Sequence, residues 1–351
     1  MQRSNGVASE KVRVGIIGAG RNTKSRHIPG LQAIEGVEII GVCNRSRESS
    51  QRVADEFGIP KIYDHWQDAI DDNETNAIVI GTWPYMHCRA TVSALMVNKH
   101  VMCEARMAMN AREAHAMRLM ARRKSKLTAQ IVPSPMTLRV DNTIKRLIAE
   151  GYIGDVLAIE VRAGGTFLEA ETSLQWRQDF DLSGLNIMSM GIWYEAIMRW
   201  VGEATRISAM GNTFVKMRPD DDGIMRSVRI PEHIDVIGEL GCGAQLHMQI
   251  SAVTGLAGVP EVFIFGSLGT LRFSANKLYG GQKGDEVLNE IDIPAEEEGG
   301  WRVEEEFVNA IRGEETITHT DFDTGVKYME FTEAVTRSIS SGNAISLPLQ
   351  L

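Results

Sequence analysis

The residues with the clearest chemical pattern follow the first apolar run of the chain. Residues 12–17, VRVGII, lead into GAGRNT, where Gly18 and Gly20 stand two apart and Thr23 occupies the usual place of a third glycine. In such a fingerprint the first glycine permits a tight turn, and the second lets the backbone approach a pyrophosphate at a helix N-terminus. The pattern predicts a dinucleotide site, and the alternative is a tight turn without a ligand. The cofactor-binding residues expected here are Gly18, Gly20, Arg21 and Asn22.

The residues after the second apolar run, 37–43, bear on which dinucleotide is bound. An acidic side chain at this place would accept hydrogen bonds from the ribose 2′-hydroxyl and repel a 2′-phosphate. The chain instead has Asn44, Arg45 and Arg47. Arginine can pair with phosphate, although asparagine can still bond a hydroxyl. We therefore expect NADP in preference to NAD. In the alternative interpretation Arg47 only opens the next helix in solvent.

A third strand end offers further side chains for the cofactor. The stretch GTWPYMH, residues 81–87, follows an apolar run, and its proline predicts a rigid turn at the carboxyl edge of the sheet. Ligands of open α/β sheets bind at that edge. The expected lining residues are Thr82, Trp83, Pro84 and His87. A structural role for His87 stays open beside a functional one.

Aromatic and charged side chains gather again between residues 176 and 181. Trp176 and Arg177 precede Asp179 and Asp181 in an expected loop. Indole faces suit the apolar faces of sugars, while arginine and aspartate suit hydroxyls or an acidic group. The stretch therefore predicts substrate contacts through Trp176, Arg177 and Asp181. Alternatively, Trp176 anchors the loop in the core.

The elements that must position these residues alternate regularly in the first part of the chain. Apolar, β-branched runs are separated by helix-compatible stretches, as in successive βαβ units with helices on both faces of a parallel sheet. This predicts an α/β fold with a Rossmann domain over residues 1–133. From 134 to 351 helices mix with hairpins, such as 233–252 and 262–273, which predicts an α+β domain with a large, mostly antiparallel open sheet.

Composition narrows the class of protein. The 351 residues carry a net charge of −9 with 43% hydrophobic residues, which fits a globular protein and argues against nucleic-acid binding. No apolar run is long enough to span a membrane, and the N-terminal MQRSNGVASEK lacks the apolar core of a signal peptide. The four cysteines form no CxxC pair and the eight histidines no metal-binding pattern. We expect a cytoplasmic protein without a metal site.

Several stretches in order along the chain resemble the Gfo/Idh/MocA family (glucose–fructose oxidoreductase, inositol dehydrogenase and rhizopine catabolism). They are GIIGAG, GTWPYMH, HVMCEA, LIAEGYIGDV, WRQDFDLSG, MGIWYEAIMRWVG, FGSLGTLRF and EAVTRSISSGNAISLP. The resemblance covers nearly the whole chain. It implies a Rossmann domain, a C-terminal α/β domain whose open sheet mediates homodimers or homotetramers, a nicotinamide cofactor, and a sugar, cyclitol or related polyol as substrate.

The departures from the family's motifs concern proton transfer. The family's fifth-strand motif is usually Glu-Lys-Pro, and its lysine helps to move the proton of the substrate hydroxyl. Here Glu104, Ala105 and Arg106 stand at those places. An aspartate and a histidine four residues later are common in the second domain, where this chain has Ser189 and Trp193. The usual proton-handling positions are therefore all changed.

Hydride transfer from a secondary alcohol still needs a group that takes the hydroxyl proton. Tyr194 directly follows the missing histidine, and a neighbouring cation such as Arg106 would lower the pKa of its hydroxyl. Arg106 stays protonated and could bind a carboxylate or an oxyanion. Glu104 is a further candidate for catalysis and for the cofactor, whereas Glu195 is a weaker one. We expect Ser189, Trp193 and Tyr194 to line the substrate site, although a half-buried structural Tyr194 fits equally well.

Three functions follow from this pattern. The first is an NAD(P)-dependent oxidoreductase with a non-standard proton-transfer group. The second is a redox-neutral hydrolase or lyase that oxidises a glycoside transiently with bound NAD(P). The third is a cofactor-binding protein without catalysis. The first is preferred. The changed proton-handling positions favour the second and third more than is usual for the family, whereas Trp176, Arg177, Asp181 and Tyr194 favour an active site of some kind.

Overall fold

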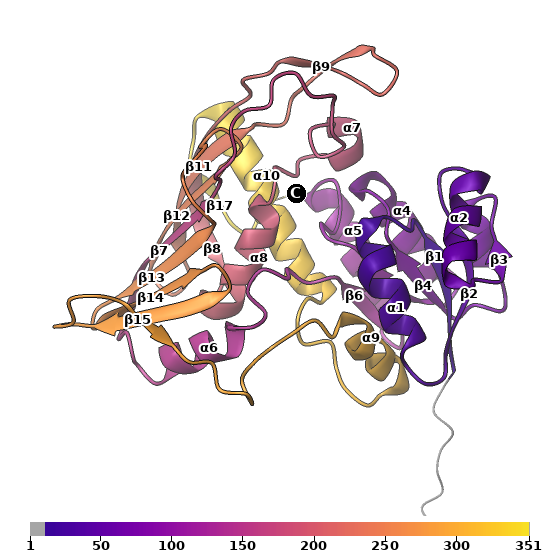
Figure 1. Cartoon of the computed structure of the whole chain (residues 1–351), viewed down its shortest axis with the longest axis horizontal. Coiled ribbons are helices and arrows are strands. Elements are labelled where there is room, and N and C mark those ends of the chain that lie inside the picture. The colour runs from indigo at the N-terminus through magenta and orange to yellow at the C-terminus, as the bar shows by residue number, and fades with distance from the viewer. Residues whose placement is uncertain (1–10, 351) are drawn as a thin grey trace, which may run out of the picture. The chain divides into compact units, whose positions relative to one another are not determined.

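The computed structural model describes residues 11–350, so nearly all of the polar N-terminal stretch analysed above lies outside the described residues. The chain divides into two compact units, which are taken separately below. The N-terminal unit is built on a six-stranded parallel sheet in the order β3-β2-β1-β4-β5-β6 (Figure 1). Its strands are β1 (Val12–Ile17), β2 (Val37–Cys43), β3 (Lys61–Ile62), β4 (Ala77–Ile80), β5 (His100–Cys103) and β6 (Ala129–Ile131).

Helices connect these strands, and both faces of the central strands are buried. All four residues of β4 are buried, for example, which explains its continuous apolar run. The helices are a π-helical turn η1 (Thr23–His27), α1 (Ile28–Gln32), α2 (Arg47–Phe57), α3 (Trp66–Asp71), α4 (Pro84–Met96) and α5 (Ala111–Arg123). Local signals set their ends. A capping box of Ser46 and Ser49 starts α2, Gly58 in the left-handed conformation ends it, and α4 begins at a proline.

The C-terminal unit contains a nine-stranded sheet in the order β16-β15-β14-β13-β7-β12-β11-β8-β17. Only β7 and β12 pair in parallel, so the expectation of a mostly antiparallel sheet is confirmed. The strands are β7 (Val156–Ala163), β8 (Ala204–Asn212), β11 (His233–Leu240), β12 (Gln245–Ser251), β13 (Glu261–Gly266), β14 (Gly269–Ser274), β15 (Lys277–Gln282), β16 (Asn289–Ile291) and β17 (Ile345–Ser346).

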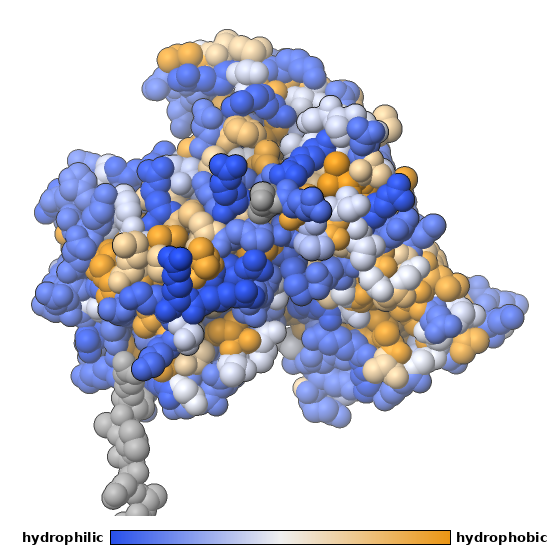
Figure 2. Space-filling model, turned by 180° about the vertical axis from the view of Figure 1, so that it is seen from behind, coloured by the Kyte–Doolittle hydropathy of each residue, from blue (hydrophilic) through white to orange (hydrophobic). Residues whose placement is uncertain are grey.

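Helices cover one face of this sheet. They are α6 (Asp141–Ala149), α8 (Met190–Val201) and α10 (Phe322–Ser341), whereas the short helix α7 (Phe180–Ser183) lies away from the sheet (Figure 1). Ring contacts within the unit join α8 to the sheet and to α10, since Trp193 lies against Phe273 of β14 and Tyr194 stacks on Phe331 of α10. On the opposite face, alternate side chains such as Ile237 of β11 remain 60% exposed. Hydrophobic surface is accordingly visible over this unit in Figure 2.

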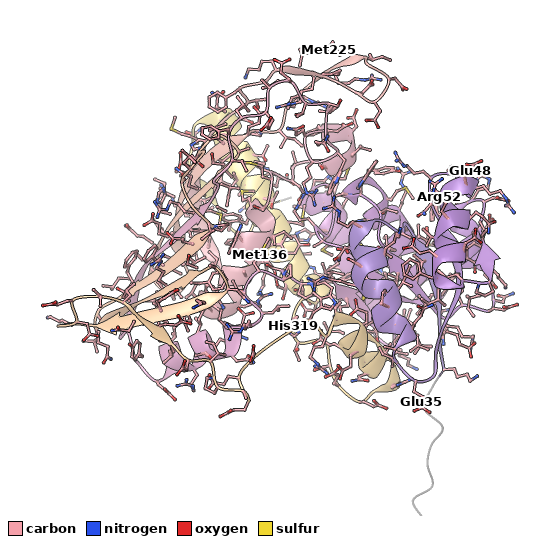
Figure 3. The ribbon with its side chains drawn as sticks, viewed as in Figure 1. Glu35, Glu48, Arg52, Met136, Met225 and His319 are labelled. Atoms are coloured by element: carbon pink, nitrogen blue, oxygen red, sulfur yellow. The ribbon has the colours of Figure 1, made fainter. Side chains whose placement is uncertain are left out.

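A small hairpin extends from the C-terminal unit. Its strands β9 (Met217–Pro219) and β10 (Met225–Ser227) pair only with each other, and Met225 lies on the outer part of the hairpin (Figure 3). Arg218 of β9 is nevertheless buried, with its side chain 1% exposed. Its guanidinium donates to backbone oxygens of Glu169 and Thr172 and pairs with Glu232 at 2.8 Å. Arg218 therefore ties the segment around residues 169–172 to the hairpin.

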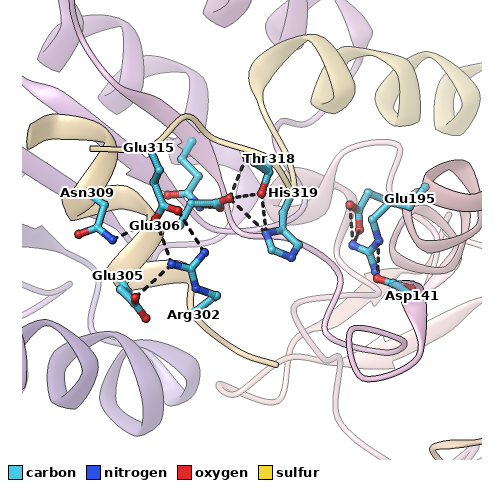
Figure 4. A network of polar contacts seen from close by, with 11 residues as sticks. Asp141, Glu195, Arg302, Glu305, Glu306, Asn309, Glu315, Thr318 and His319 are labelled. Carbon is cyan, nitrogen blue, oxygen red and sulfur yellow. Dashed lines mark hydrogen bonds and ion pairs between the residues drawn. The ribbon is translucent and has the colours of Figure 1, made fainter. Parts of the chain in front are cut away.

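Residues 302–325 return to the N-terminal unit, so the expected second domain of 134–351 is interrupted there. Helix α9 (Val303–Arg312) packs against α1, and the amide of Ile131 in β6 donates to the carbonyl of Thr320 at 3.0 Å. Buried Glu306 accepts hydrogen bonds from Gln130 of β6 and from Thr318, next to His319 (Figure 4). The returning segment is thus a built-in part of the first unit.

Among the residues that the structure describes, no helix combines the length and the hydrophobicity needed to cross a membrane. Within the same range, no group of histidine, cysteine and acidic side chains could hold a metal ion.

Candidate active site

The glycine turn after β1 has the shape that the motif predicts. Gly18 has a φ of +85°, and its amide donates to the carbonyl of Cys43 at 2.8 Å. A Cβ at Gly18 would lie 2.7 Å from the backbone nitrogen of Thr82, so only glycine fits. At Gly20 a Cβ would meet nothing nearer than 3.6 Å, at the carbonyl of Gly81. Gly18 is therefore required by the protein itself, whereas Gly20 leaves its backbone open.

Thr23 stands where the fingerprint usually has its third glycine, and the structure accommodates it locally. Its buried hydroxyl donates to the carbonyl of Gly18 at 3.2 Å. The neighbouring strand end provides the space, because a Cβ at Gly81 would collide with the Thr23 hydroxyl. A glycine at position 81 thus replaces the usual glycine at position 23 as the point of close packing.

A cavity of about 650 Å³ opens beside this turn within the N-terminal unit. Its lining includes Gly18, Ala19, Gly20, Asn44, Arg45, Ser49, Asp64, His65, Trp66, Gly81, Thr82, Trp83, Tyr85 and Met86. The hydroxyl oxygen of Thr82 is buried here and has no hydrogen-bond partner among the described residues. A cavity at the carboxyl edge of a parallel sheet, with a glycine cradle and an unused polar atom, fits a dinucleotide.

The side chains after β2 divide into two groups. Asn44 serves the turn itself, because its Oδ1 accepts the amide of Ala19 at 2.7 Å. Arg45 lines the cavity and lies over the ring of Trp83, 4.8 Å from its centroid. Arg47 does not line the cavity: it is exposed as the first residue of α2 and pairs with Asp64. The alternative interpretation of Arg47 therefore agrees with the structure better than a cofactor contact does.

Three further residues expected at the cofactor, Pro84, Arg21 and His87, have different places in the structure. Pro84 is the first residue of α4, and Arg21 is an exposed side chain outside the cavity lining. His87 is fully buried between the carbonyls of Thr82 and Arg106, at 3.0 and 2.9 Å. Burial lowers the pKa of His87. His87 therefore links the ends of β4 and β5. This contact agrees with the structural role of His87 rather than with a functional one.

Glu104 follows β5 and belongs to a buried polar cluster. Its amide donates to the carbonyl of Ile80 at 2.9 Å, which places it at the end of the adjacent strand β4. Its carboxylate accepts from Asn22 and lies 2.9 Å from Nε2 of His27, whose Nδ1 contacts Glu304 of α9. Burial is the largest influence and raises the pKa of Glu104, but the hydrogen bonds from His27, Asn22 and the amide of Ala105, together with the charge of His27, lower it by more, so the net shift is downward.

Sequence reasoning missed His27 and Glu304. His27 lies in the helix after the glycine turn and could have been noticed as a histidine near the cofactor motif. Glu304 is 277 residues away in the sequence, and nothing local distinguishes it from the neighbouring Glu305 and Glu306. Only the return of residues 302–325 to the N-terminal unit brings this glutamate to the histidine.

Ala105 and Arg106 follow Glu104 in the position of the family's lysine and proline. The peptide bond between them is cis. The carbonyl oxygen of Arg106 lies 2.9 Å from Nδ1 of His87, and the Arg106 residue is only 4% exposed. Ala105 has no group that could move a proton, so Glu104 is the titratable side chain that this strand end presents.

Tyr194 does not have the properties expected of a proton-transfer group. Its side chain is in the core of the C-terminal unit, stacked on Phe331 at 3.6 Å between centroids. Its hydroxyl accepts the amide of Ala204 at 2.8 Å. Burial raises the pKa of Tyr194, so the expected lowering by a cation is wrong. The structure supports the alternative of a packed aromatic side chain.

Trp193 and Glu195, on either side of Tyr194 in α8, have structural contacts as well. Trp193 is 3% exposed and packs on Phe273, so it forms core rather than a wall of a substrate site. Ser189 is the N-cap position of α8, but its side chain makes no capping hydrogen bond, so its expected substrate contact stays a prediction. Glu195 is buried and bonds the amide of Ser134 at 2.7 Å and the guanidinium of Arg199 at 2.9 Å (Figure 4). This pair fixes the start of the C-terminal unit to α8.

The expected substrate residues around 176–181 are more accessible. Arg177 is exposed and lies over the ring of Trp176, 4.2 Å from its centroid. Asp181 is exposed and pairs loosely with Arg229 at 3.4 Å. Trp176 is partly exposed. Within the C-terminal unit these side chains stay candidates for substrate contact.

The parallel sheet with its glycine cradle defines the N-terminal unit as a dinucleotide-binding Rossmann domain. Residues 12–131 match an oxidoreductase family with an NAD-binding Rossmann fold, and residues 142–272 match the GFO/IDH/MocA C-terminal domain. The two matches together span most of the chain, which belongs to the GFO/IDH/MocA family of oxidoreductases.

Individual relatives are distant. Glucose-6-phosphate 3-dehydrogenase of Bacillus subtilis (strain 168) is 26% identical over 258 residues, 71% of this chain and 69% of that protein. Trans-1,2-dihydrobenzene-1,2-diol dehydrogenase of Oryctolagus cuniculus is 26% identical over 189 residues, 52% of this chain and 56% of that protein. Among solved structures, levoglucosan dehydrogenase with NADH and L-sorbose has a TM-score of 0.84 at 19% identity, covering 96% of this chain and 99% of that one. At that identity the likeness concerns the fold.

Proposed function

We propose that this chain is an NAD(P)-dependent oxidoreductase that acts on a hydroxyl-bearing carbon of a sugar, cyclitol or similar polyol. The observation that carries the proposal is the cavity of about 650 Å³ beside the glycine turn, with Glu104 at the adjoining strand end. Relatives named as dehydrogenases of glucose 6-phosphate and levoglucosan support the sugar-like substrate. When bound, the nicotinamide would supply or accept the hydride.

The residues of the chain would hold this cofactor in a definite way. The backbone at Gly18 and Gly20 would approach the pyrophosphate, because neither glycine presents a side chain there. Thr82 would use its buried hydroxyl toward the cofactor. Arg45, stacked on Trp83, would meet the adenosine end at the end of β2.

The finer preference for NADP rests on Arg45. No carboxylate stands at position 44, where it would repel a 2′-phosphate, and the Arg45 guanidinium lines the cavity. We expect Arg45→Ala to weaken NADP binding by on the order of ten-fold while leaving NAD affinity nearly unchanged. Arg52→Ala is the matched control, since Arg52 is an exposed arginine of α2 that does not line the cavity. Titration calorimetry with both cofactors measures this, and clearly tighter NAD binding by the unchanged protein would refute the preference.

Turnover separates the proposed reaction from its alternatives. The purified protein would be mixed with NAD(P) and a panel of sugars and polyols, and the absorbance of the reduced nicotinamide followed alongside product analysis. Reduction of one cofactor per product supports the proposal. Product without net reduction would instead indicate a redox-neutral hydrolase or lyase. Tight cofactor binding without any turnover would indicate a non-catalytic protein.

The outer face of the nine-stranded sheet supports a proposal about assembly into homodimers or homotetramers. The face has a shallow depression of about 470 Å³ whose lining includes Ile237, Phe265, Glu160 and Arg206. Apolar groups and both signs of charge on one surface suit a symmetric contact, in which each patch meets its own copy. A second copy of this chain is therefore the occupant that we propose for this face.

A further inference from the structure

A buried cluster in the N-terminal unit joins three parts of the chain that are distant in sequence. His27 comes from η1, Glu104 from the end of β5 and Glu304 from α9. The His27 side chain is 0% exposed, and its two ring nitrogens each face a carboxylate. Glu104 is 14% exposed and Glu304 only 5%, so Glu104 is the more accessible member.

The geometry determines the proton content of this cluster. A neutral imidazole has one N–H, and its other nitrogen is an acceptor that would repel a carboxylate. With a carboxylate at each nitrogen, the favourable arrangement is an imidazolium between two ionised glutamates, with a net charge of −1. Burial alone would lower the pKa of His27, but hydrogen bonds to Glu104 and Glu304 raise it to about 9. One additional proton would make the cluster neutral.

We propose that Glu104, His27 and Glu304 together accept the proton that the substrate hydroxyl releases, in place of the lysine that Ala105 replaces. The inference rests on the proposed oxidoreductase function. Glu104 takes the proton as the hydroxyl O–H bond breaks and the carbon loses hydride to the nicotinamide cofactor. His27 can pass a proton from its Nδ1 to Glu304 and regain one from Glu104 at Nε2. His27 and Glu304 are positioning residues, because they act through Glu104.

Other titratable groups near Glu104 do not compete for this proton. His87 interacts electrostatically with Glu104, but it is fully buried between two backbone carbonyls and burial lowers its pKa. Burial raises the pKa of the Cys103 thiol well above its usual value, and the charge of Glu104 raises it further. The cluster therefore titrates as a unit whose apparent pKa depends on its net charge.

The first experiment compares pH profiles of kcat for an accepted substrate. Glu304→Gln removes a negative charge, so the acid limb should move to lower pH by about one unit, whereas His27→Gln removes the cation and should move it higher by about one unit. Glu104→Gln should lower kcat by on the order of a hundred-fold or more, with cofactor affinity retained. His319→Gln is the control, because His319 contacts the different carboxylate of Glu306 and should leave the profile unchanged.

Shifts in opposite directions are the signature, because a loss of packing would not change sign between the two variants. Limbs that stay in place, or move in the same direction, would overturn the proposal. Circular dichroism identifies any variant that fails to fold, and the remaining variant still has a predicted direction.

The second experiment needs neither substrate nor cofactor. Nitrogen-15 NMR of the histidine rings should find His27 doubly protonated at pH 8 in the unchanged protein, and Glu304→Gln should lower its pKa. Titration of His27 near its ordinary value would overturn the proposal even if turnover is normal. A protonated His27 in a protein that oxidises no sugar or polyol would instead count against the proposed function. The two failures are therefore distinguishable.

Discussion

Gly18 and Gly20 belong to one motif, but glycine is needed at the two positions for different reasons. Gly18 has a left-handed backbone and packs against the amide of Thr82, so the folded chain needs it. Gly20 has room for a methyl group against its own protein, and its openness matters only toward a ligand. At the scale of single residues, the structure thus separates a conformational requirement from a binding requirement.

This difference predicts opposite outcomes for two alanine variants. Gly18→Ala should destabilise the N-terminal unit by about 1–3 kcal/mol, because of backbone strain and the contact with Thr82. Gly20→Ala should leave the free energy of unfolding nearly unchanged and weaken cofactor binding at least about ten-fold, because its methyl group would meet the pyrophosphate. Urea unfolding and cofactor titration measure the two quantities. Equal cofactor affinity for Gly20→Ala and the unchanged protein would contradict the assignment of the cradle.

Tyr194 shows how a plausible catalytic side chain can be structural. Tyr194→Phe should reduce the free energy of unfolding by about 1–2 kcal/mol, since the buried amide of Ala204 loses its acceptor. Turnover of the folded variant should remain close to that of the unchanged protein. The comparison is made at a temperature where circular dichroism shows both proteins folded. A fall in kcat of more than about ten-fold would return Tyr194 to the candidate site.

At the scale of elements, buried arginines attach irregular segments to regular ones. Arg199 of α8 pairs with Glu195 and Asp141, and it also bonds the carbonyl of Ser134, which secures the stretch before α6. Arg218 does the same for the segment that precedes the expected substrate residue Trp176. The amide of Leu174 also bonds the hairpin, at the carbonyl of Pro219. These segments have few regular hydrogen bonds of their own and depend on the charged anchor.

The hairpin anchor leads to a prediction about local stability. Arg218→Ala should cost about 3–5 kcal/mol, because Glu232 would remain buried without its cation. Hydrogen exchange should increase in residues 169–174, which lose their attachment. The matched control is Arg226→Ala in the same hairpin, where the arginine is exposed and pairs with Asp220 at the surface. Unchanged exchange in 169–174 would mean that the segment holds its shape without Arg218.

At the scale of the whole molecule, the C-terminal sheet has one face packed by helices and one face without them (Figure 1). Antiparallel sheets tolerate one solvated face, but this face combines exposed Ile237 with aromatic side chains such as the stacked Phe263 and Phe265. Contiguous apolar surface of this kind marks interaction sites. It is the basis for the proposed contact between copies.

Ile237→Glu should therefore shift the protein toward monomers. A carboxylate in the centre of a symmetric contact meets its own copy, and both charges lose water. Light scattering coupled to size-exclusion chromatography measures the change in mass. Leu256→Glu is the control, since Leu256 is 88% exposed in a loop outside the sheet and should not alter the mass. A monomeric unchanged protein would refute the proposed assembly.

The sequence by itself determined those features that depend on neighbours along the chain. The alternation of apolar runs and helices, the glycine turn at Gly18 and the helix starts at Ser46 and Pro84 all follow from local conformational preferences. For this reason the parallel sheet and its dinucleotide-binding turn could be predicted, whereas the family was inferred from the resemblance of several motifs in order along the chain. The antiparallel second sheet was predictable from its hairpins in the same way.

Only the tertiary structure decided which polar side chains meet. The residues around Tyr194 in the sequence do not predict that it stacks on Phe331. The residues around Glu304 likewise do not predict its contact with His27. Burial and pairing depend on segments that are far apart in the sequence, and they set the charge and pKa of each group. The sequence could therefore show that the usual lysine is missing at Ala105. The buried contacts of Glu104, which support a replacement, exist only in the folded chain.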